Sequence, residues 1–301
     1  MELRHIRYFN AVAEHLNVRV ASERLHVTQP AVSRQIHDLE DELGVSLFHR
    51  TARGLRLTES GEAFHGDCGR ILALVEHARQ RVRLTGQGLS GHLHIGTVES
   101  AGWDGLLPRA IGQYQSEAPA VSLRLSPLAT PRQLAALSSG EIDAGVAYLL
   151  GDVPQTLEVL PLARHDVILA VPADAPPPRA PMVRAAELDG QPFVLFHRSV
   201  YPAYHDRLLA ACQRAGLTPR IVQEVDSESA ELTLVSAGIG VAIVNSANLS
   251  RPPARVRFVP LADVSVPLPL SFAWLRTNAN PALLRFSDLL RRLALQSPPA
   301  A

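Results

Sequence analysis

Residues 28–40 read TQPAVSRQIHDLE, and this stretch predicts a helix whose two faces differ in chemistry. Apolar side chains recur at steps of four, three and four residues, which is the spacing of one helical stripe. Pro30 suits a first helical turn, and Thr28 stands where a capping residue is expected. One face should therefore pack while the other stays free for contacts. The stripe consists of Val32, Ile36, Leu39 and Leu43.

The segment just before this helix predicts a second, shorter helix. Residues 19–27 read RVASERLHV, with the small Ala21 and Ser22 followed by the apolar Leu25 and Val27. Small side chains allow two helices to approach closely across a tight turn. Together the two segments predict a helix-turn-helix.

The free face of the longer helix carries side chains suited to reading DNA. Arg34 can donate two hydrogen bonds to guanine, and Gln29 can pair with adenine in the major groove. Ser33 could hold a phosphate, and His37 lies away from the apolar stripe as well. An ordinary amphipathic surface helix would show the same pattern, so the prediction depends on the surrounding sequence.

The run LFHRTARGLRLTESG supplies that context. Residues 51–54 form a turn signal, and residues 55–57 alternate like a short strand. A hairpin of this kind would place Arg50 and Arg53 near a phosphate backbone or a narrow minor groove. A solvated turn is the alternative for either arginine alone.

These motifs, at this spacing, resemble the LysR-type transcriptional regulators. The resemblance is carried by MELRHIRYFNAVAE and by ASERLHVTQPAVSRQIHDLEDELGVSLFHRTARGLRLTESG, and it extends over nearly the whole chain. Asn17, Val18 and Arg19 stand where many members have Ser-Phe-Thr. We interpret this departure as a changed entry into the first helix of the motif, with DNA binding retained.

Charge gives the main sequence-level argument against DNA binding. The 301 residues carry a net charge of +0, and residues 1–60 hold eight arginines against eight acidic residues. The distribution of the charges answers this objection. The acidic residues 40–42 lie at the far end of the helix from Arg34, so the net count does not describe the contact side. The length allows more than one domain.

The chain shows no signal peptide and no apolar stretch long enough to cross a membrane, so we expect a cytoplasmic protein. Cys68 and Cys212 have neither disulfide nor metal-ligand spacing. Some relatives sense oxidants through a cysteine pair in the sensor domain, where only Cys212 lies here. Both cysteines are expected to be reduced packing residues.

Residues 59–84 form a long helical pattern whose apolar positions alternate at four and three steps. Packing on its own domain is one explanation, but Leu72 and Leu74 widen the apolar surface. The resemblance implies a dimerising linker helix that presents two DNA-binding heads to two half-sites. A glycine-rich hinge should follow it, over residues 86–91. The apolar positions are Phe64, Cys68, Ile71, Val75, Ala78 and Val82.

Beyond the hinge, apolar strands alternate with helical segments, which predicts parallel α/β units. The expected fold class is α/β: a winged helix-turn-helix, a linker helix and two Rossmann-like subdomains similar to solute-binding proteins. The C-terminal strand and helix should return to the first subdomain. The expected divisions are residues 1–58 for the DNA-binding domain, 59–91 for the linker and hinge, 92–163 with 268–301 for subdomain I, and 164–267 for subdomain II.

Ligands of open α/β sheets bind beyond the carboxyl ends of the strands, where Ser100 and Thr130 each precede a helical segment. Both could hold an anion, or could serve only as helix caps. By resemblance, they match hydroxyls that bind an inducer's carboxylate. The same resemblance places residues 197–204 on the opposite lip: His197 and Arg198 could neutralise a carboxylate, and Tyr201 and Tyr204 could stack on a ring. The remaining expected contacts are Tyr148, Pro202 and Ser227.

Part of this half is similar to regulators of aromatic and chloroaromatic degradation, through LLPRAI, EIDAGVAYL and the Thr130 segment. That subgroup tends to carry an arginine where Tyr148 stands, and a proline where Asn245 stands. Loss of the arginine makes a muconate-like dicarboxylate less favoured. A monoacid, a phenolic compound or an amino-acid derivative stays open.

The residue patterns do not favour an enzyme. The sequence contains no nucleophile elbow, Cys-x-x-Cys, His-Glu-x-x-His or Gly-Lys-Ser/Thr motif. His92 and His94 share one face of an expected strand, which is more often solvated than metal-binding. We expect a DNA-binding regulator without cofactor or metal, modulated by an organic acid or aromatic effector. A solute-binding or redox-sensing protein is the alternative.

The partners that the resemblance implies are promoter DNA, the effector, and further copies of the chain in a dimer or tetramer. RNA polymerase is a further partner of such a regulator. A membrane is not expected among them. The sequence names neither the effector, the target genes nor the sign of regulation.

Overall fold

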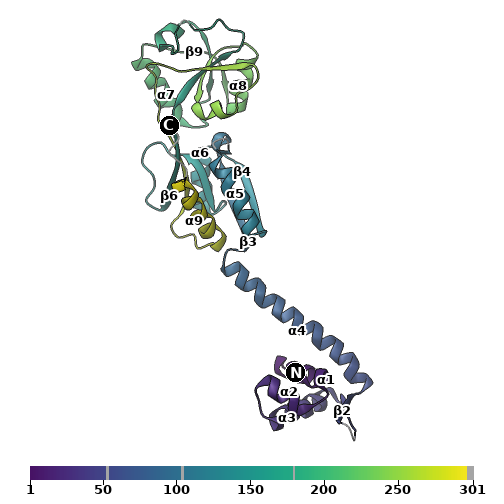
Figure 1. Cartoon of the computed structure of the whole chain (residues 1–301). Coiled ribbons are helices and arrows are strands. Elements are labelled where there is room, and N and C mark those ends of the chain that lie inside the picture. The colour runs from purple at the N-terminus through teal and green to yellow at the C-terminus, as the bar shows by residue number, and fades with distance from the viewer. Residues whose placement is uncertain (52–53, 103–104, 179, 297–301) are drawn as a thin grey trace. The chain divides into compact units, whose positions relative to one another are not determined.

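The chain forms two compact units, Met1–Leu84 and Thr85–Ala301. The computed structural model describes residues 1–51, 54–102, 105–178 and 180–296 (Figure 1). In the first unit three helices precede a hairpin and a long helix. They are α1 (Leu3–His15), α2 (Val18–Leu25), α3 (Gln29–Leu43), β1 (Phe48–Thr51), β2 (Gly54–Leu57) and α4 (Glu59–Gly86).

The helix-turn-helix prediction is confirmed as α2 and α3, with the entry into α2 made by Asn17. The Asn17 side chain accepts hydrogen bonds from the backbone N–H groups of Arg19 (2.9 Å) and Val20 (3.3 Å). Asparagine is among the best residues for satisfying the free N–H groups of a first turn. Thr28 stands at the N-cap of α3, but its side chain makes no capping hydrogen bond. The expected capping by Thr28 was therefore wrong.

The core of the first unit is built around Phe9 of α1. Its ring centroid lies 5.3 Å from that of Phe48 and 4.9 Å from that of Phe64. Gly61 permits close packing here, because an added Cβ would lie 2.1 Å from the Leu47 carbonyl oxygen. In the expected apolar stripe of α3, Val32, Ile36 and Leu39 are buried, whereas Leu43 at the helix end is exposed.

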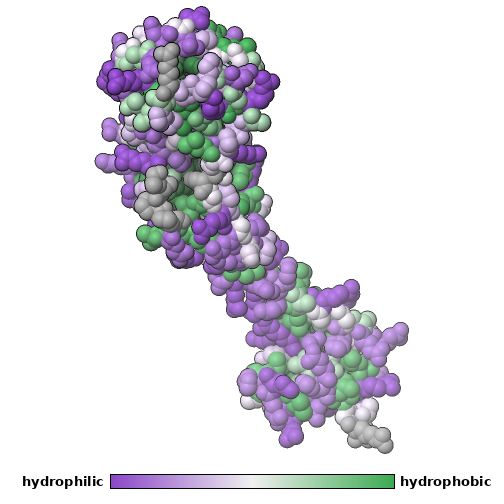
Figure 2. Space-filling model, turned by 45° about the horizontal axis from the view of Figure 1, so that its top comes forward, coloured by the Kyte–Doolittle hydropathy of each residue, from purple (hydrophilic) through white to green (hydrophobic). Residues whose placement is uncertain are grey.

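The long helix α4 uses its two halves differently. Phe64, Cys68 and Ile71 pack into the core of the first unit, as a helix folded onto its own domain would. Farther along, Leu74 and Val82 are 69% and 74% exposed. In Figure 2, green hydrophobic surface interrupts the purple hydrophilic surface along this helical segment. The apolar seam therefore continues past the part that its own domain covers.

The second unit begins with a mixed five-stranded sheet in the order β4-β3-β5-β12-β6. Helix α9 returns to this sheet and packs on α5, where Tyr114 meets Phe286 edge to face. The strands are β3 (Ser90–Thr97), β4 (Ala120–Pro127), β5 (Ala144–Tyr148), β6 (Leu157–His165) and β12 (Leu268–Leu275). The helices are η1 (Glu99–Gly102), α5 (Leu106–Glu117), α6 (Thr130–Ser139) and α9 (Pro281–Gln296).

The remaining strands and their helices form a second α/β subdomain, here called the second α/β layer, and the five-stranded sheet with its helices is the first. Strands β10, β7 and β11 are hydrogen-bonded in that order, and β8 pairs with β9. A bridge from Phe193 to Val241 joins β8 to the residue before β10. The strands are β7 (Val167–Pro172), β8 (Pro192–Phe196), β9 (Arg220–Val225), β10 (Ala242–Asn245) and β11 (Val256–Val259). The helices are η2 (Ala185–Leu188), α7 (Pro202–Arg214), α8 (Glu228–Ser236) and η3 (Ser246–Ser250).

The expectation of parallel sheets was only partly right. Strand β3 is parallel to β4 and β5, and β8 is parallel to β9. The strand that follows each crossing between the layers is antiparallel to its neighbours. After the first crossing, β7 is antiparallel to β10 and β11, and after the second, β12 is antiparallel to β5 and β6. A strand that returns from the neighbouring layer enters its sheet without the helical crossover that a parallel neighbour requires.

Asp166 ties together the two places where the chain crosses between the layers. It lies between β6 and β7, and its carboxylate accepts hydrogen bonds from the Val167 N–H (2.7 Å) and the Val266 N–H (2.7 Å). The Ser265 hydroxyl donates to the same carboxylate at 2.5 Å. One side chain thereby holds the outgoing and returning segments side by side.

The expected glycine hinge is shorter than the sequence indicates. Helix α4 continues to Gly86 and β3 already begins at Ser90, so Ser90 and Gly91 belong to the sheet. Gly88 has a φ of +68°, and an added Cβ would lie 2.3 Å from the Pro281 carbonyl oxygen. Its small size permits this turn against the start of α9.

Candidate functional site

The face of α3 opposite the buried stripe is exposed along its whole first half. It begins just after the α2–α3 turn, where His26 ends α2 with a φ of +53°. Residues four apart on a helix lie on the same face. The exposed residues of this face and its N-cap are Thr28, Gln29, Pro30, Ser33, Arg34 and His37.

The basic side chains on this face are only loosely held by the protein. The Arg34 guanidinium is 83% exposed and lies 4.0 Å from the Asp38 carboxylate, and His37 lies 3.7 Å from Asp41. Exposed pairs at these distances contribute about 0–1 kcal/mol. An incoming polyanion could therefore displace either partner at small cost.

The acidic end of α3 has a structural role. The Glu40 side chain accepts hydrogen bonds from the backbone N–H groups of Leu47 (2.6 Å) and Phe48 (3.2 Å). These bonds connect α3 to the first strand of the hairpin, β1. Glu42 forms an ion pair with the N-terminal amino group of Met1.

The hairpin presents Arg50 as an exposed side chain on β1, opposite Leu55 on β2. Arg53 lies outside the described residues. Gly54 follows with a φ of +126°, a conformation that glycine adopts without strain.

The second unit contains a cavity of about 300 Å³ between its two α/β layers. Its size is at the lower end of the range of small-molecule sites. Loops that follow β3, β4 and β8 contribute to its wall, together with the start of α8. The lining residues are Val98, Glu99, Ser100, Pro127, Leu128, Ala129, Thr130, Tyr148, Phe196, Val200, Tyr201, Tyr204, Asp226, Ser227, Glu228, Asn245 and Leu268.

On the wall from the first layer, hydroxyl groups form a connected chain. The Ser100 Oγ lies 3.3 Å from the Tyr148 hydroxyl, which lies 2.8 Å from His165 Nδ1 at the end of β6. Ser100 and Tyr148 are both buried. A ligand that contacts Ser100 or Tyr148 would thus touch a network that extends to the crossing between the layers.

Thr130 contributes a buried hydroxyl that the protein bonds only weakly. The residue is 2% exposed, and within the described part of the chain its Oγ1 makes no hydrogen bond of good geometry. The Tyr201 hydroxyl donates to the Tyr148 carbonyl (2.5 Å) and accepts from the Leu150 N–H (3.1 Å), and its contact with the Thr130 side chain acts to lower the pKa of Tyr201. Buried hydroxyls usually form a full hydrogen bond, so a ligand atom could complete the bonding of Thr130.

The two tyrosines of the expected lip reach the cavity but have their hydroxyls occupied. Tyr204 donates to the Ile243 carbonyl at 3.3 Å, and burial raises its pKa well above the ordinary value. Burial also raises the pKa of Tyr201. Both therefore offer ring surface rather than a free hydroxyl.

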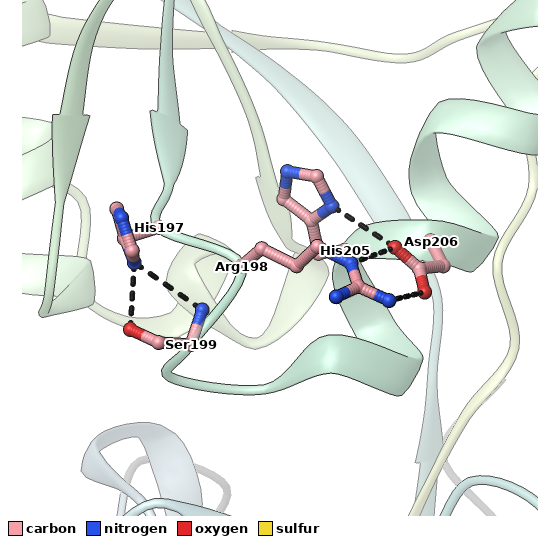
Figure 3. Close-up of polar contacts among 5 residues, drawn as sticks. All are labelled: His197, Arg198, Ser199, His205 and Asp206. Carbon is pink, nitrogen blue, oxygen red and sulfur yellow. Dashed lines mark hydrogen bonds and ion pairs between the residues drawn. The ribbon is translucent and has the colours of Figure 1, made fainter.

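Other residues of the expected lip lie elsewhere. The described lining does not include His197, Arg198 or Pro202. Arg198 donates two hydrogen bonds to the Asp206 carboxylate, at 2.8 and 2.7 Å. Figure 3 shows this pair, with His197 turned to Ser199. This arginine holds the pKa of Asp206 at about 2. The cation expected to neutralise a carboxylate ligand is therefore paired with Asp206, a residue of α7.

Ser227 lines the cavity, but its side chain caps α8. The Ser227 Oγ accepts a hydrogen bond from the Ala230 N–H at 3.2 Å, so the capping explanation applies to it. Pro202 is likewise a first-turn residue of α7.

Carboxylates are the site residues that sequence reasoning missed. Glu228 is buried at the cavity wall, and Asn248 donates to its Oε1 at 2.6 Å. Burial raises the pKa of Glu228 to about 7, and the negative Glu99 nearby adds to the shift. Glu231, one turn on, is fully buried, and both its oxygens are unpartnered within the described residues. Acidic residues on the apolar face of VDSESAELTLV were the available signal.

Metal-binding and membrane-spanning features receive no support from the described parts of the chain. There, no cluster of three or more histidine, cysteine or acidic side chains could hold a metal ion. His94 uses both ring nitrogens, with the Glu141 carbonyl at 3.0 Å and the Ser126 hydroxyl at 2.8 Å. No helix found there has the length and apolar character needed to cross a membrane.

Comparison with known proteins identifies both units. Residues 3–62 match the model of the bacterial regulatory helix-turn-helix protein, lysR family, and residues 86–294 match that of the LysR substrate binding domain. The chain is 36% identical over 295 residues to the HTH-type transcriptional regulator TfdS of Cupriavidus pinatubonensis, covering 97% of this chain and 98% of that one. It is 32% identical to AlsR of Bacillus subtilis, with 95% and 94% covered.

Solved structures give the same picture. The LysR family transcriptional regulator CbnR superposes with a TM-score of 0.81 at 30% identity, covering 97% of this chain and 100% of that chain. The full-length CbnR structure with its target DNA gives the same TM-score and identity, covering 98% and 100%.

Proposed function

The chain belongs to the LysR family of transcriptional regulators, and we propose that it binds promoter DNA through α3 and the β1–β2 hairpin. The observation that carries this proposal is the exposed face of α3, where Gln29, Ser33 and Arg34 stand opposite the buried part of the apolar stripe. Arg34 and Gln29 would read base edges, and Ser33 and Arg50 would contact phosphates. Thr28, Pro30, His37 and Arg53 complete the proposed contact set.

A small molecule bound in the cavity of the second unit would modulate this DNA binding. Ser100, Thr130 and Tyr148 come from one α/β layer, and Tyr201, Tyr204 and Ser227 come from the other. A ligand that contacts both layers favours one angle between them, which shifts the population of conformations. We take the proposed subdomains to be residues 92–163 with 268–301, and 164–267.

Self-association would present two recognition helices to two half-sites of a palindrome. The exposed apolar residues in the second half of α4 support a dimer through that helix, and a dimer of dimers would give the proposed tetramer. Contact with RNA polymerase belongs to the same proposal. The function needs no cofactor.

Selection from a random-sequence duplex library tests the proposal. The full chain should enrich a site with two related half-sites, and the affinity for that site should fall steeply as salt rises. Enrichment of no sequence, at a salt concentration where the protein still binds duplex, would contradict a role as a sequence-specific regulator.

A further inference from the structure

The described lining of the effector cavity includes acidic side chains and the first turn of a helix. Glu99, Asp226 and Glu228 are its charged residues, and arginine and histidine are absent from that lining. The chain has no lysine. A free carboxylate ligand therefore meets no side-chain cation there, which disfavours the organic acid expected from the sequence.

The start of α6 favours negative charge in the cavity. Ala129 and Thr130, at the start of α6, both line it. The first turn of a helix leaves N–H groups without intrahelical acceptors and carries a partial positive charge. The buried Oγ1 of Thr130 contacts the Tyr201 side chain but makes no hydrogen bond of good geometry within the described residues, which is an independent sign that a ligand atom belongs at this place. Ser100 adds a second buried hydroxyl.

A second helix N-terminus in the cavity wall is already occupied. The Glu99 carboxylate accepts from the N–H groups of Glu228 (2.9 Å) and Ser229 (3.3 Å), and from the Ser229 hydroxyl (2.7 Å). The start of α8 is thus neutralised by the protein itself. That leaves α6 to receive an anionic group and Glu228 to receive a cationic one.

We infer that the cavity selects a small amino acid, with the ligand carboxylate at Thr130 and Ser100 and the ligand ammonium at Glu228. The body of the ligand would pack on Phe196, Tyr204 and Leu268. An ammonium group over an aromatic face gains further stabilisation. This inference rests on the proposed regulatory cavity and adds the chemical class of the effector to it.

Two matched series of probes, each with one carbon skeleton, test the inference on the full chain by calorimetry. Phenylalanine is compared with 3-phenylpropanoate and 2-phenylethylamine, and 6-aminohexanoate with hexanoate and hexylamine. In at least one series the zwitterion should bind about tenfold or more tightly than both single-charge analogues. Equal or tighter binding of an acid overturns the inference, as does failure of both zwitterions to bind.

The variant Glu228→Gln keeps the shape and the acceptor oxygen for Asn248 but removes the charge. It should weaken binding of the zwitterion about tenfold or more and leave the affinity for the acid analogue unchanged. Glu231→Gln is the matched control, because Glu231 is a buried carboxyl on the same helix that does not line the cavity. Equal binding of the zwitterion by wild type and Glu228→Gln would overturn the inference.

The pH dependence gives a separate readout. Glu228, whose pKa is about 7, must be ionised to hold an ammonium group, so zwitterion affinity should rise about tenfold from pH 6 to pH 8. Glu99, Glu231 and Tyr204 also interact with this carboxyl, and Asp226 lines the same cavity. The rise should vanish in Glu228→Gln. An affinity that falls with pH would mean that protonated Glu228 donates to an acid, which contradicts the inference.

These tests separate the effector class from the proposed function. Tight binding of an acid alone would reject the amino acid but keep a ligand-binding regulator. Failure of the library selection would reject the regulator whatever binds in the cavity.

Discussion

The Glu99 carboxylate of the first α/β layer accepts a hydrogen bond from the backbone N–H of Glu228 in the second, at 2.9 Å. Two further bonds, from the Ser229 N–H and hydroxyl, strengthen this link. It joins the layers at the rim of the cavity, whereas Asp166 joins them at the crossing segments. Glu99 therefore links the two layers at the cavity wall.

Replacement of Glu99 should loosen the link between the layers. Glu99→Gln removes the charge from three hydrogen bonds and from the positive end of α8, which should cost about 1–2 kcal/mol of unfolding free energy. Denaturant unfolding of the full chain measures this. The control Asp174→Asn affects an exposed pair 3.8 Å from Arg255 and should change stability by less than about 0.5 kcal/mol. Equal effects would show that Glu99 is an ordinary surface carboxylate.

Glu228 should make stability depend on pH. Its pKa is raised from 4.5 to about 7, so the folded state holds the proton more tightly than the unfolded state. Stability contributed by this group is full below about pH 4.5 and falls as pH rises to 7, by about 3 kcal/mol in total. Glu228→Gln should lack that fall and be the more stable form at pH 8. A constant difference between wild type and variant from pH 5 to pH 8 would contradict the assignment.

The two cysteines should react slowly with a thiol reagent. Burial raises the pKa of Cys68 and Cys212 to about 11 each, so little thiolate exists at pH 8. Each lies in the core of its own unit. Reaction with a disulfide reagent should be about a hundredfold slower in the native protein than in denaturant. Rapid native-state modification of Cys212 would revive the redox-sensing alternative.

The exposed half of α4 should govern self-association. Val82→Asp places a charge on the proposed seam and should weaken the dimer about tenfold or more. Leu295→Asp is the matched control, because Leu295 is 83% exposed on α9, outside that seam. Sedimentation over a concentration series compares the two. Loss of association in the control but not in Val82→Asp would place the interface elsewhere.

Local sequence patterns predicted the DNA-binding unit well and the cavity only partly. Val32, Ile36 and Leu39 are periodic, so the face that packs could be identified without a fold. The polarity of the cavity depends on contacts between distant residues, such as Glu99 with Ser229. Arg198 and Glu228 show the problem, because an expected site cation pairs with Asp206 while an unremarked acid lines the wall.

The strand directions could not be predicted for a similar reason. Alternating strands and helices indicate parallel pairs, and β3 with β4 obeys that pattern. The direction of β12 is set by where the chain returns from the second layer, which no local pattern records. Asp166 makes its contacts across about a hundred residues of sequence and gave no motif.

The measurement that tests the account most directly is the affinity of Arg34→Ala for the duplex enriched by the wild-type chain. Arg34 should contribute about 1–3 kcal/mol, so the variant should bind that site about 5- to 150-fold more weakly and should distinguish less between bases at one position of the site. Arg70→Ala, which removes an arginine from the exposed surface of α4, should bind as wild type. Wild-type affinity and sequence preference in Arg34→Ala would contradict α3 as the reading helix.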